Sequence, residues 1–108
     1  MKVSNAFQAF FNEAPEHAKA WMGAVQGLDK ASALNKKTEE LAYLAVMASQ
    51  RLVSGIPFHV GLAKAAGASR EEVISAVLIG LPAVGNTVIE ALPVALDAYD
   101  APDVANDR

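Results

Sequence analysis

The chain has 108 residues, 53% of them hydrophobic and 19% charged, a length that suits one domain with a single modest core. The formal net charge is -3, and no basic run is longer than Lys36-Lys37. The sequence therefore does not predict a positively charged surface that would bind nucleic acid or an anionic membrane. Because the chain has no cysteine, disulfides, thiolate metal sites and cysteine nucleophiles are excluded.

Apolar residues recur at helical spacing along nearly the whole chain, and strand-like alternation is absent, so the sequence predicts an all-α domain. Ser4 suits the N-cap of a first helix, in which the phenylalanines at positions 7, 10 and 11 form one stripe. Pro15 suits the first turn of a second helix. The residues that this second helix is expected to bury follow the same spacing: Ala18, Trp21, Met22, Val25 and Leu28.

Two further helices are predicted in the middle of the chain. Asn35 is a suitable N-cap for a third helix that runs to about Gln50 or Arg51. The residues of this segment that are expected to face inward are Leu41, Leu44, Ala45 and Leu52. Ser54 is expected to cap a fourth helix, which Gly67 ends in the way a glycine past a helix C-terminus commonly does.

The segment Ser69–Glu72 has the S-x-x-E pattern of a capping box, in which the serine hydroxyl and the glutamate carboxylate each accept from a free backbone amide. It opens a fifth helix. Proline and glycine interrupt the pattern at residues 80–86, and a sixth helix with a bend at Pro93 follows. We therefore expect a single helical domain over residues 1–100 and a disordered tail over 101–108.

The fourth and sixth predicted helices are apolar on more than one side, and a small helical domain cannot cover two such faces alone. The sequence therefore predicts a homo-oligomer. No apolar run approaches the ~20 residues that span a bilayer, and Asn, Gln, Glu and Pro interrupt the N-terminal segment before a signal peptide could form. We expect a cytoplasmic protein without membrane or nucleic-acid partners.

Few polar residues fall within the apolar pattern, and these are the candidates for chemistry: Glu40, Arg51, His59 and Asn86. Glu40 and Arg51 lie on one stripe of the third helix, at a spacing that also carries the core-type residues Leu44 and Met47. Two distant histidines without cysteines give no recognisable metal-ligand spacing. Neither a metal nor a cofactor is expected.

Glu40 and His59 approach each other if the third and fourth helices form an antiparallel hairpin that turns near Arg51. Glu40 then lies about eleven residues before the turn and His59 about seven after it, an axial mismatch of roughly 6 Å at ~1.5 Å per residue. One long side chain and one water would bridge this distance, so direct contact is not implied. A carboxylate linked to an imidazole fixes its tautomer and raises its basicity.

Structural interpretations of the same residues stay open at this point. A lone histidine on an apolar helix is commonly a satisfied core or interface residue, and Glu40 with Arg51 would also serve as a structural ion pair or as charges at the rim of an apolar surface. Small residues surround His59 in the segment SGIPFHVGLAKAAG, and they suit close helix packing without a cavity.

The segment LNKKTEELAYLAVMASQRLVSGIPFHVGLAKAAGASREEVISAVLIG resembles the carboxymuconolactone decarboxylase and alkylhydroperoxidase D-like superfamily. The matching pieces are L-s-x-K-T-x-E-L, a spacing like R-C-x-x-C-x-x-x-H, and A-x-x-x-G-[AV]-[ST]-x-E-E, in that order. The resemblance extends from about Pro15 to Tyr99. It implies an all-α domain of about six helices around a central hairpin, assembled into trimers or hexamers, with pockets that a neighbouring chain often helps to line.

Carried over by position, the superfamily's proton-relay glutamate matches Glu40, its arginine matches Arg51 and its histidine matches His59. The two redox cysteines of the peroxidase branch fall on Leu52 and Gly55, neither of which can attack a peroxide or form a disulfide. A thiol peroxidase mechanism is therefore excluded for this chain.

The decarboxylase branch of the superfamily works without the cysteine pair, on a γ-lactone carboxylate that loses carbon dioxide with a proton shift. Thr87 stands where a further histidine is common in that branch, so the resemblance does not fix the substrate. It implies a lyase or isomerase that uses His59 as general acid or base, Glu40 to orient it, and Arg51 to bind a substrate carboxylate. The alternative is a non-catalytic, oligomeric relative of the thiol peroxidases that binds a ligand or partner.

Overall fold

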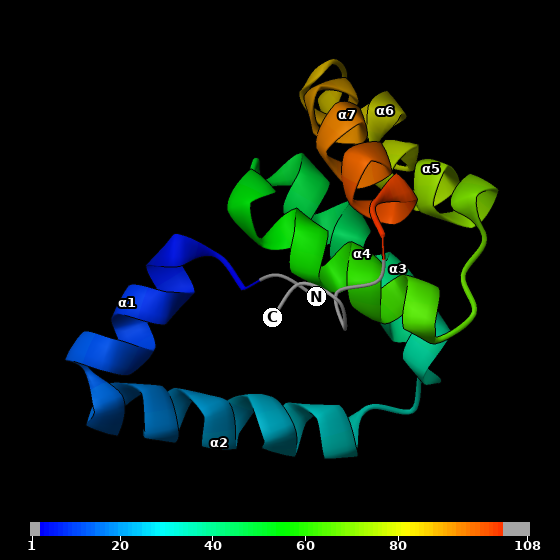
Figure 1. Cartoon of the computed structure of the whole chain (residues 1–108). Helices are drawn as coiled ribbons and strands as arrows, with labels where there is room; N and C mark the ends of the chain where they lie inside the picture. The colour runs from blue at the N-terminus through cyan, green and yellow to red at the C-terminus, as the bar shows by residue number, and fades with distance from the viewer. Residues whose placement is uncertain (1–2, 103–108) are drawn as a thin grey trace.

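The computed structural model describes residues 3–102, which form helices joined by short connections, without a strand in that range (Figure 1). The all-α prediction is confirmed. In chain order the elements are α1 (Asn5–Glu13), α2 (Pro15–Ala31), α3 (Lys36–Ser49), the 3-10 turn η1 (Val53–Gly55), α4 (Ile56–Ala65), α5 (Arg70–Leu78), α6 (Leu81–Val84) and α7 (Thr87–Asp100).

The helix starts that depend on local capping are confirmed. The side chains of Ser4, Asn35 and Ser69 each accept a hydrogen bond from the backbone N–H three residues later, at 3.2, 2.9 and 3.0 Å. The carboxylate of Glu72 also accepts from the Ser69 N–H at 2.8 Å, which completes the predicted capping box. Its hydrogen bonds, first of all the one from the Ser69 backbone and then the one from Lys37, lower the pKa of Glu72.

The predicted start of the fourth helix is wrong. Ser54 lies in η1 and caps no helix, and α4 begins at Ile56 with Pro57 in its first turn. Proline has the fixed φ of a helix and needs no hydrogen-bond partner for its nitrogen, so the chain enters α4 there. The predicted end is confirmed, because Gly67 follows α4 with φ +96°. Near the C-terminus, α6 precedes α7, and α7 continues through Pro93.

The hydrophobic core lies among α3, α4, α5 and α7, which pack against one another and which we call the body. Its largest fully buried side chains are Leu44, Ile56, Val60, Val73, Val77 and Val88. Leu44 is buried as predicted and Leu41 packs against the core, but Leu52 is exposed. The helical phase ends before Leu52, because α3 stops at Ser49 and Arg51 adopts a left-handed φ of 59°.

Helices α1 and α2 form an arm that stands apart from the body in Figure 1. The arm packs chiefly within itself, and an ion pair of 3.3 Å between Asp29 and Lys36 ties the end of α2 to the start of α3. The prediction that α2 buries Trp21, Val25 and Leu28 is therefore wrong for the single chain, in which all three are exposed. Of the five residues predicted to be buried in α2, Ala18 is buried and Met22 is half-buried.

The predicted disorder of the tail falls mostly on residues 103–108, which lie outside the described residues. Among residues 3–102, no helix has both the length and the apolar character needed to cross a membrane.

Candidate acid-base site

Glu40 and His59 meet directly between α3 and α4. Nδ1 of His59 lies 2.8 Å from Oε1 of Glu40. Glu40 is 5% exposed and is the buried charged residue of the described chain, whereas the His59 side chain keeps 22% of its surface exposed. The structure thus places a carboxylate inside the protein with its imidazole partner at the surface.

The direct contact is closer than the hairpin geometry of the sequence suggests. Since α3 ends at Ser49, Glu40 is nearer to the turn than a helix ending at Arg51 would place it. The 3-10 turn before α4 rises about 2.0 Å per residue in place of 1.5 Å, which carries His59 farther from the turn. Both changes reduce the axial mismatch, and no bridging water is needed.

The carboxylate determines which nitrogen of His59 carries the proton. An ionised carboxylate only accepts hydrogen bonds, so Nδ1–H of His59 donates to Glu40. In the neutral imidazole Nε2 then holds the lone pair, and within residues 3–102 it has no hydrogen-bond partner. His59 is therefore held in the tautomer that presents a base at Nε2.

Lys36 balances part of the charge of Glu40. Its ammonium nitrogen lies 3.8 Å from Oε2 of Glu40, and also contacts Glu39 at 3.4 Å and Asp29 at 3.3 Å. The hydrogen bond from Lys36 to Asp29 raises the pKa of the lysine, which keeps it charged. Side-chain hydrogen bonding, first with Glu39 and then with Lys36, lowers the pKa of Asp29. The end of the arm is thus linked electrostatically to the carboxylate of the site.

Two aromatic rings that the sequence did not single out border the imidazole. The Tyr43 ring lies 4.6 Å from that of His59, and the Phe58 ring lies 5.3 Å away, both edge to face. Tyr43 follows Glu40 by three residues, the spacing that places two side chains on one face of a helix, and this signal could have found it. The rings restrict how the imidazole turns, and Tyr43 itself is exposed.

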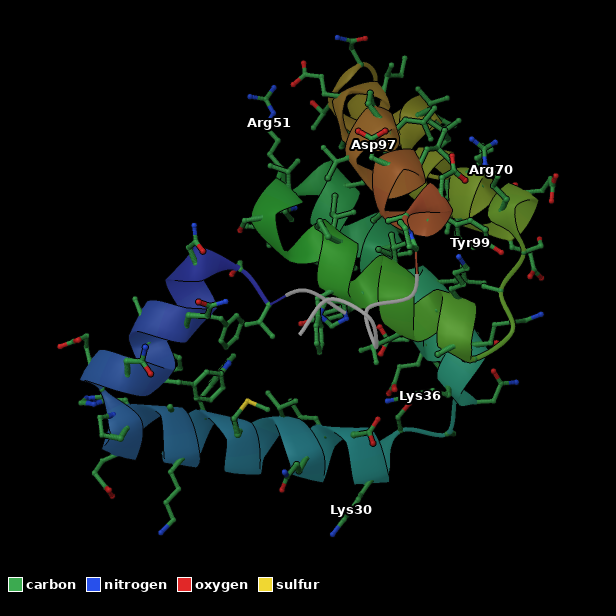
Figure 2. The ribbon with its side chains drawn as sticks, viewed as in Figure 1. Lys30, Lys36, Arg51, Arg70, Asp97 and Tyr99 are labelled. Carbon is green, nitrogen blue, oxygen red and sulfur yellow. The ribbon has the colours of Figure 1, made fainter. Side chains whose placement is uncertain are left out.

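Arg51 does not join Glu40 and His59. It follows the C-terminal end of α3, whereas Lys36 begins that helix, and Figure 2 shows the two side chains at opposite ends of the body. The Arg51 guanidinium donates to the Thr87 hydroxyl at 3.4 Å. Asn86 precedes α7 without a side-chain capping bond. The role of Arg51 in substrate binding stays a prediction.

The left-handed backbone at Arg51 predicts an ordering of two variants. Arg51→Val is expected to have a free energy of unfolding about 1 kcal/mol lower than that of Arg51→Gly. A left-handed backbone destabilises a residue with a Cβ by ~1–2 kcal/mol. The greater conformational freedom of glycine in the unfolded chain offsets part of this difference. Both variants lose the Thr87 bond, so their comparison isolates the backbone. Urea unfolding would measure the difference, and equal midpoints would contradict it.

The described surface has three hollows, and none of them contains the Glu40–His59 pair. One is between the start of α3 and the end of α4, where Lys36 lines it, one between α3 and α5, and one between α1 and α2. None of the three is lined by Glu40 or His59. No cluster of three or more metal-ligand side chains occurs within residues 3–102. Of the pair, His59 alone therefore reaches the surface, outside these three hollows, while Glu40 stays buried.

The sequence profile of the carboxymuconolactone decarboxylase family matches residues 15–97 of the 108. The chain belongs to this family. The matched range contains α2 to α6 and most of α7, and it includes both Glu40 and His59. No curated protein and no solved structure gives a significant match. The family resemblance identified from the sequence is confirmed.

In this member of the carboxymuconolactone decarboxylase family, a side chain at position 55 would contact the end of the Met47 side chain. A Cβ at Gly55 would lie 2.5 Å from the terminal methyl carbon of Met47, so Met47 would have to move. Met47 is itself part of the buried core. A cysteine at position 55 would therefore displace the flexible end of Met47.

Proposed function

We propose that this protein is a cofactor-free acid-base enzyme of the decarboxylase or isomerase type, acting on a small carboxylate or lactone. His59 is the general acid or base, and Glu40 is the residue that orients it. The observation that carries the proposal is the 2.8 Å contact between a buried carboxylate and an imidazole whose second nitrogen is unpartnered within the described residues.

In the decarboxylation of a carboxylated lactone, the bond between the ring carbon and the carboxylate breaks and carbon dioxide leaves. The electron pair of that bond passes into the conjugated lactone carbonyl. Nε2–H of the His59 imidazolium then protonates a carbon of the resulting dienolate as the electron pair returns from the carbonyl oxygen, and solvent returns a proton to His59. In an isomerisation, Nε2 takes a proton from one carbon and returns it to another. In both cases Glu40 stabilises the positive imidazolium.

The direct test is turnover by the purified full chain, with carboxymuconolactone as the first substrate. We expect the release of one molecule of carbon dioxide for each lactone consumed. When the reaction runs in D₂O, the new C–H position of the product should carry deuterium. An isomerase would exchange or move a proton without releasing gas. A panel of carboxylated γ-lactones that are neither decarboxylated nor isomerised would contradict the proposal.

A second candidate function is binding without catalysis, by an oligomeric relative of the thiol peroxidases. The observation that favours it is that none of the three hollows is lined by Glu40 or His59. A binding protein would take up a small carboxylate, detected by calorimetry, and would return it unchanged. Saturable binding without any turnover would favour this candidate over the enzyme.

We also infer that the protein is a homo-oligomer, a trimer or hexamer. The exposed apolar side chains of the single chain support this inference, since they include residues of the arm, of α3 and of the segment from α5 to α7.

A further inference from the structure

We propose that Lys36 is a positioning residue of the acid-base site. Its ammonium group holds one oxygen of the Glu40 carboxylate, and this keeps the other oxygen on Nδ1 of His59. Lys36 acts through Glu40, since it forms no hydrogen bond with His59 within residues 3–102. The effect on turnover rests on the proposed function, whereas the effect on the imidazole does not.

The two oxygens of the Glu40 carboxylate have different partners. Oε1 lies 2.8 Å from Nδ1 of His59, and Oε2 lies 3.8 Å from the ammonium nitrogen of Lys36. Within residues 3–102, no other lysine and no arginine forms an ion pair with Glu40. The terminal torsion of a glutamate has a broad energy minimum, so a carboxylate held by one oxygen turns easily. With a partner at each oxygen, the carboxylate of Glu40 stays directed at the imidazole.

Two further carboxylates keep the Lys36 ammonium in place. It donates hydrogen bonds to Asp29 at 3.3 Å and to Glu39 at 3.4 Å. Asp29 lies near the end of α2 and Glu39 in the first turn of α3, so carboxylates of two helices hold the lysine where the arm joins the body (Figure 2). The hydrogen bond to Asp29 raises the pKa of Lys36, so the group stays positively charged.

Burial makes the carboxylate of Glu40 dependent on a neighbouring cation. The Glu40 side chain is 7% exposed, whereas the Lys36 side chain is 54% exposed. Burial removes most of the water that would otherwise stabilise a negative charge on Oε2, and Lys36 supplies a positive charge there instead. An ionised Glu40 only accepts hydrogen bonds, so it keeps the proton of neutral His59 on Nδ1 and leaves the lone pair on Nε2.

Lys37 offers a matched comparison, because it is the next residue and pairs with a different carboxylate. Its ammonium nitrogen lies 3.0 Å from Glu72 of α5, and no ion pair within residues 3–102 links it to Glu40. Both lysines are in the first turn of α3, so the loss of either removes one positive charge from the same end of the helix. A difference between the two variants therefore reports the contact with Glu40.

The first test observes the imidazole of His59 by nitrogen-15 NMR in the full chain, without substrate. The chain has two histidines, so the His17→Gln protein identifies the signals of His59. In the neutral imidazole of the parent, we expect the proton on Nδ1, in slow exchange with water. This proton exchanges when its hydrogen bond opens. In Lys36→Met it should exchange about two- to fivefold faster, which corresponds to the usual contribution of an ion pair with an exposed member.

Three further variants determine the cause of a faster exchange. Lys36→Arg keeps a cation and should restore the parental rate, and Lys37→Met should retain that rate. Asp29→Ala should raise the rate less than Lys36→Met, because Glu39 still holds the lysine. The parental rate in Lys36→Met would overturn the proposal. An equal increase in Lys37→Met or in Asp29→Ala would also overturn it, because the charge of the helix end or the attachment of the arm would then be the cause.

The second test separates positioning from substrate binding. Lys36→Met should lower kcat about two- to fivefold and leave KM unchanged, since Lys36 acts on Glu40 and not on the substrate. Lys36→Arg should restore kcat. Lys36 also lines the hollow between the start of α3 and the end of α4. A raised KM with the parental kcat would show that Lys36 binds the substrate itself, and this would overturn the proposal.

The two tests fail independently of each other. If Lys36→Met speeds the exchange as expected but the parent turns over no carboxylated lactone, the proposed function is refuted and the positioning of the imidazole stands. If the parent is active and Lys36→Met keeps both the parental kcat and the parental exchange rate, the positioning role alone is refuted.

Discussion

Substitution of His59 by glutamine is expected to lower kcat by about 10²–10⁴-fold, the usual contribution of a positioned general acid or base. Glutamine is close in size to histidine and places its amide near the position of Nε2, but it cannot transfer the proton. The measurement is the rate of carbon dioxide release from carboxymuconolactone, or the rate of proton exchange for an isomerised substrate.

His17→Gln is the matched control for the loss of a histidine. His17 is exposed on α2, and no contact links it to Glu40 or His59. Its substitution should leave kcat and the pH profile at the parental level. Parental turnover in His59→Gln, with correct assembly and helix content, would show that the imidazole does not transfer the proton.

Substitutions of Glu40 are expected to separate its structural role from its catalytic one. Glu40→Ala should lower the free energy of unfolding by about 2 kcal/mol, because a hydrogen bond to a charged group contributes ~1.5–3 kcal/mol. Glu40→Gln keeps an acceptor for the imidazole and should lose much less. Both should lower kcat, Glu40→Gln by roughly tenfold, which corresponds to the ~1.4 kcal/mol by which a charged hydrogen bond exceeds a neutral one.

Glu39→Gln is the control for Glu40, since Glu39 adjoins it and contacts the same lysine but not His59. It should change neither stability nor kcat measurably. Urea unfolding gives the stabilities, and the turnover assay gives the rates. If Glu40→Gln retained the parental kcat, the carboxylate would have no role in orienting His59 or in stabilising its positive form. If Glu40→Ala were as stable as the parent, the free-energy cost of burying the carboxylate would equal the stabilisation that its hydrogen bond contributes.

The features predicted correctly from the sequence are those that depend on neighbours in the chain. The caps at Ser4, Asn35 and Ser69 need only a side-chain oxygen and a backbone amide three residues away, and the pattern reveals both. The burial of Leu44 likewise follows from the helical period.

The errors have a common physical origin, because an amphipathic pattern shows that a face needs covering but not what covers it. Trp21 and Leu28 lie on an apolar stripe as predicted, yet the body of the same chain does not bury them. Leu52 is expected to face inward with the third helix, but α3 ends at Ser49 and the left-handed Arg51 turns the chain before Leu52. The sequence likewise predicts that Glu40 and His59 lie near each other. Their direct contact depends on the turn between α3 and α4, whose geometry the sequence pattern does not predict.

The absence of sulfur at both positions 52 and 55 limits how the chemistry of this protein can change by mutation. A Cβ at Gly55 would displace only the flexible methyl end of Met47, which is a small shift in the core. A change to a peroxide-reducing protein therefore takes a thiol at each of the two positions. Redox function is separated from this chain by at least two substitutions, not by one.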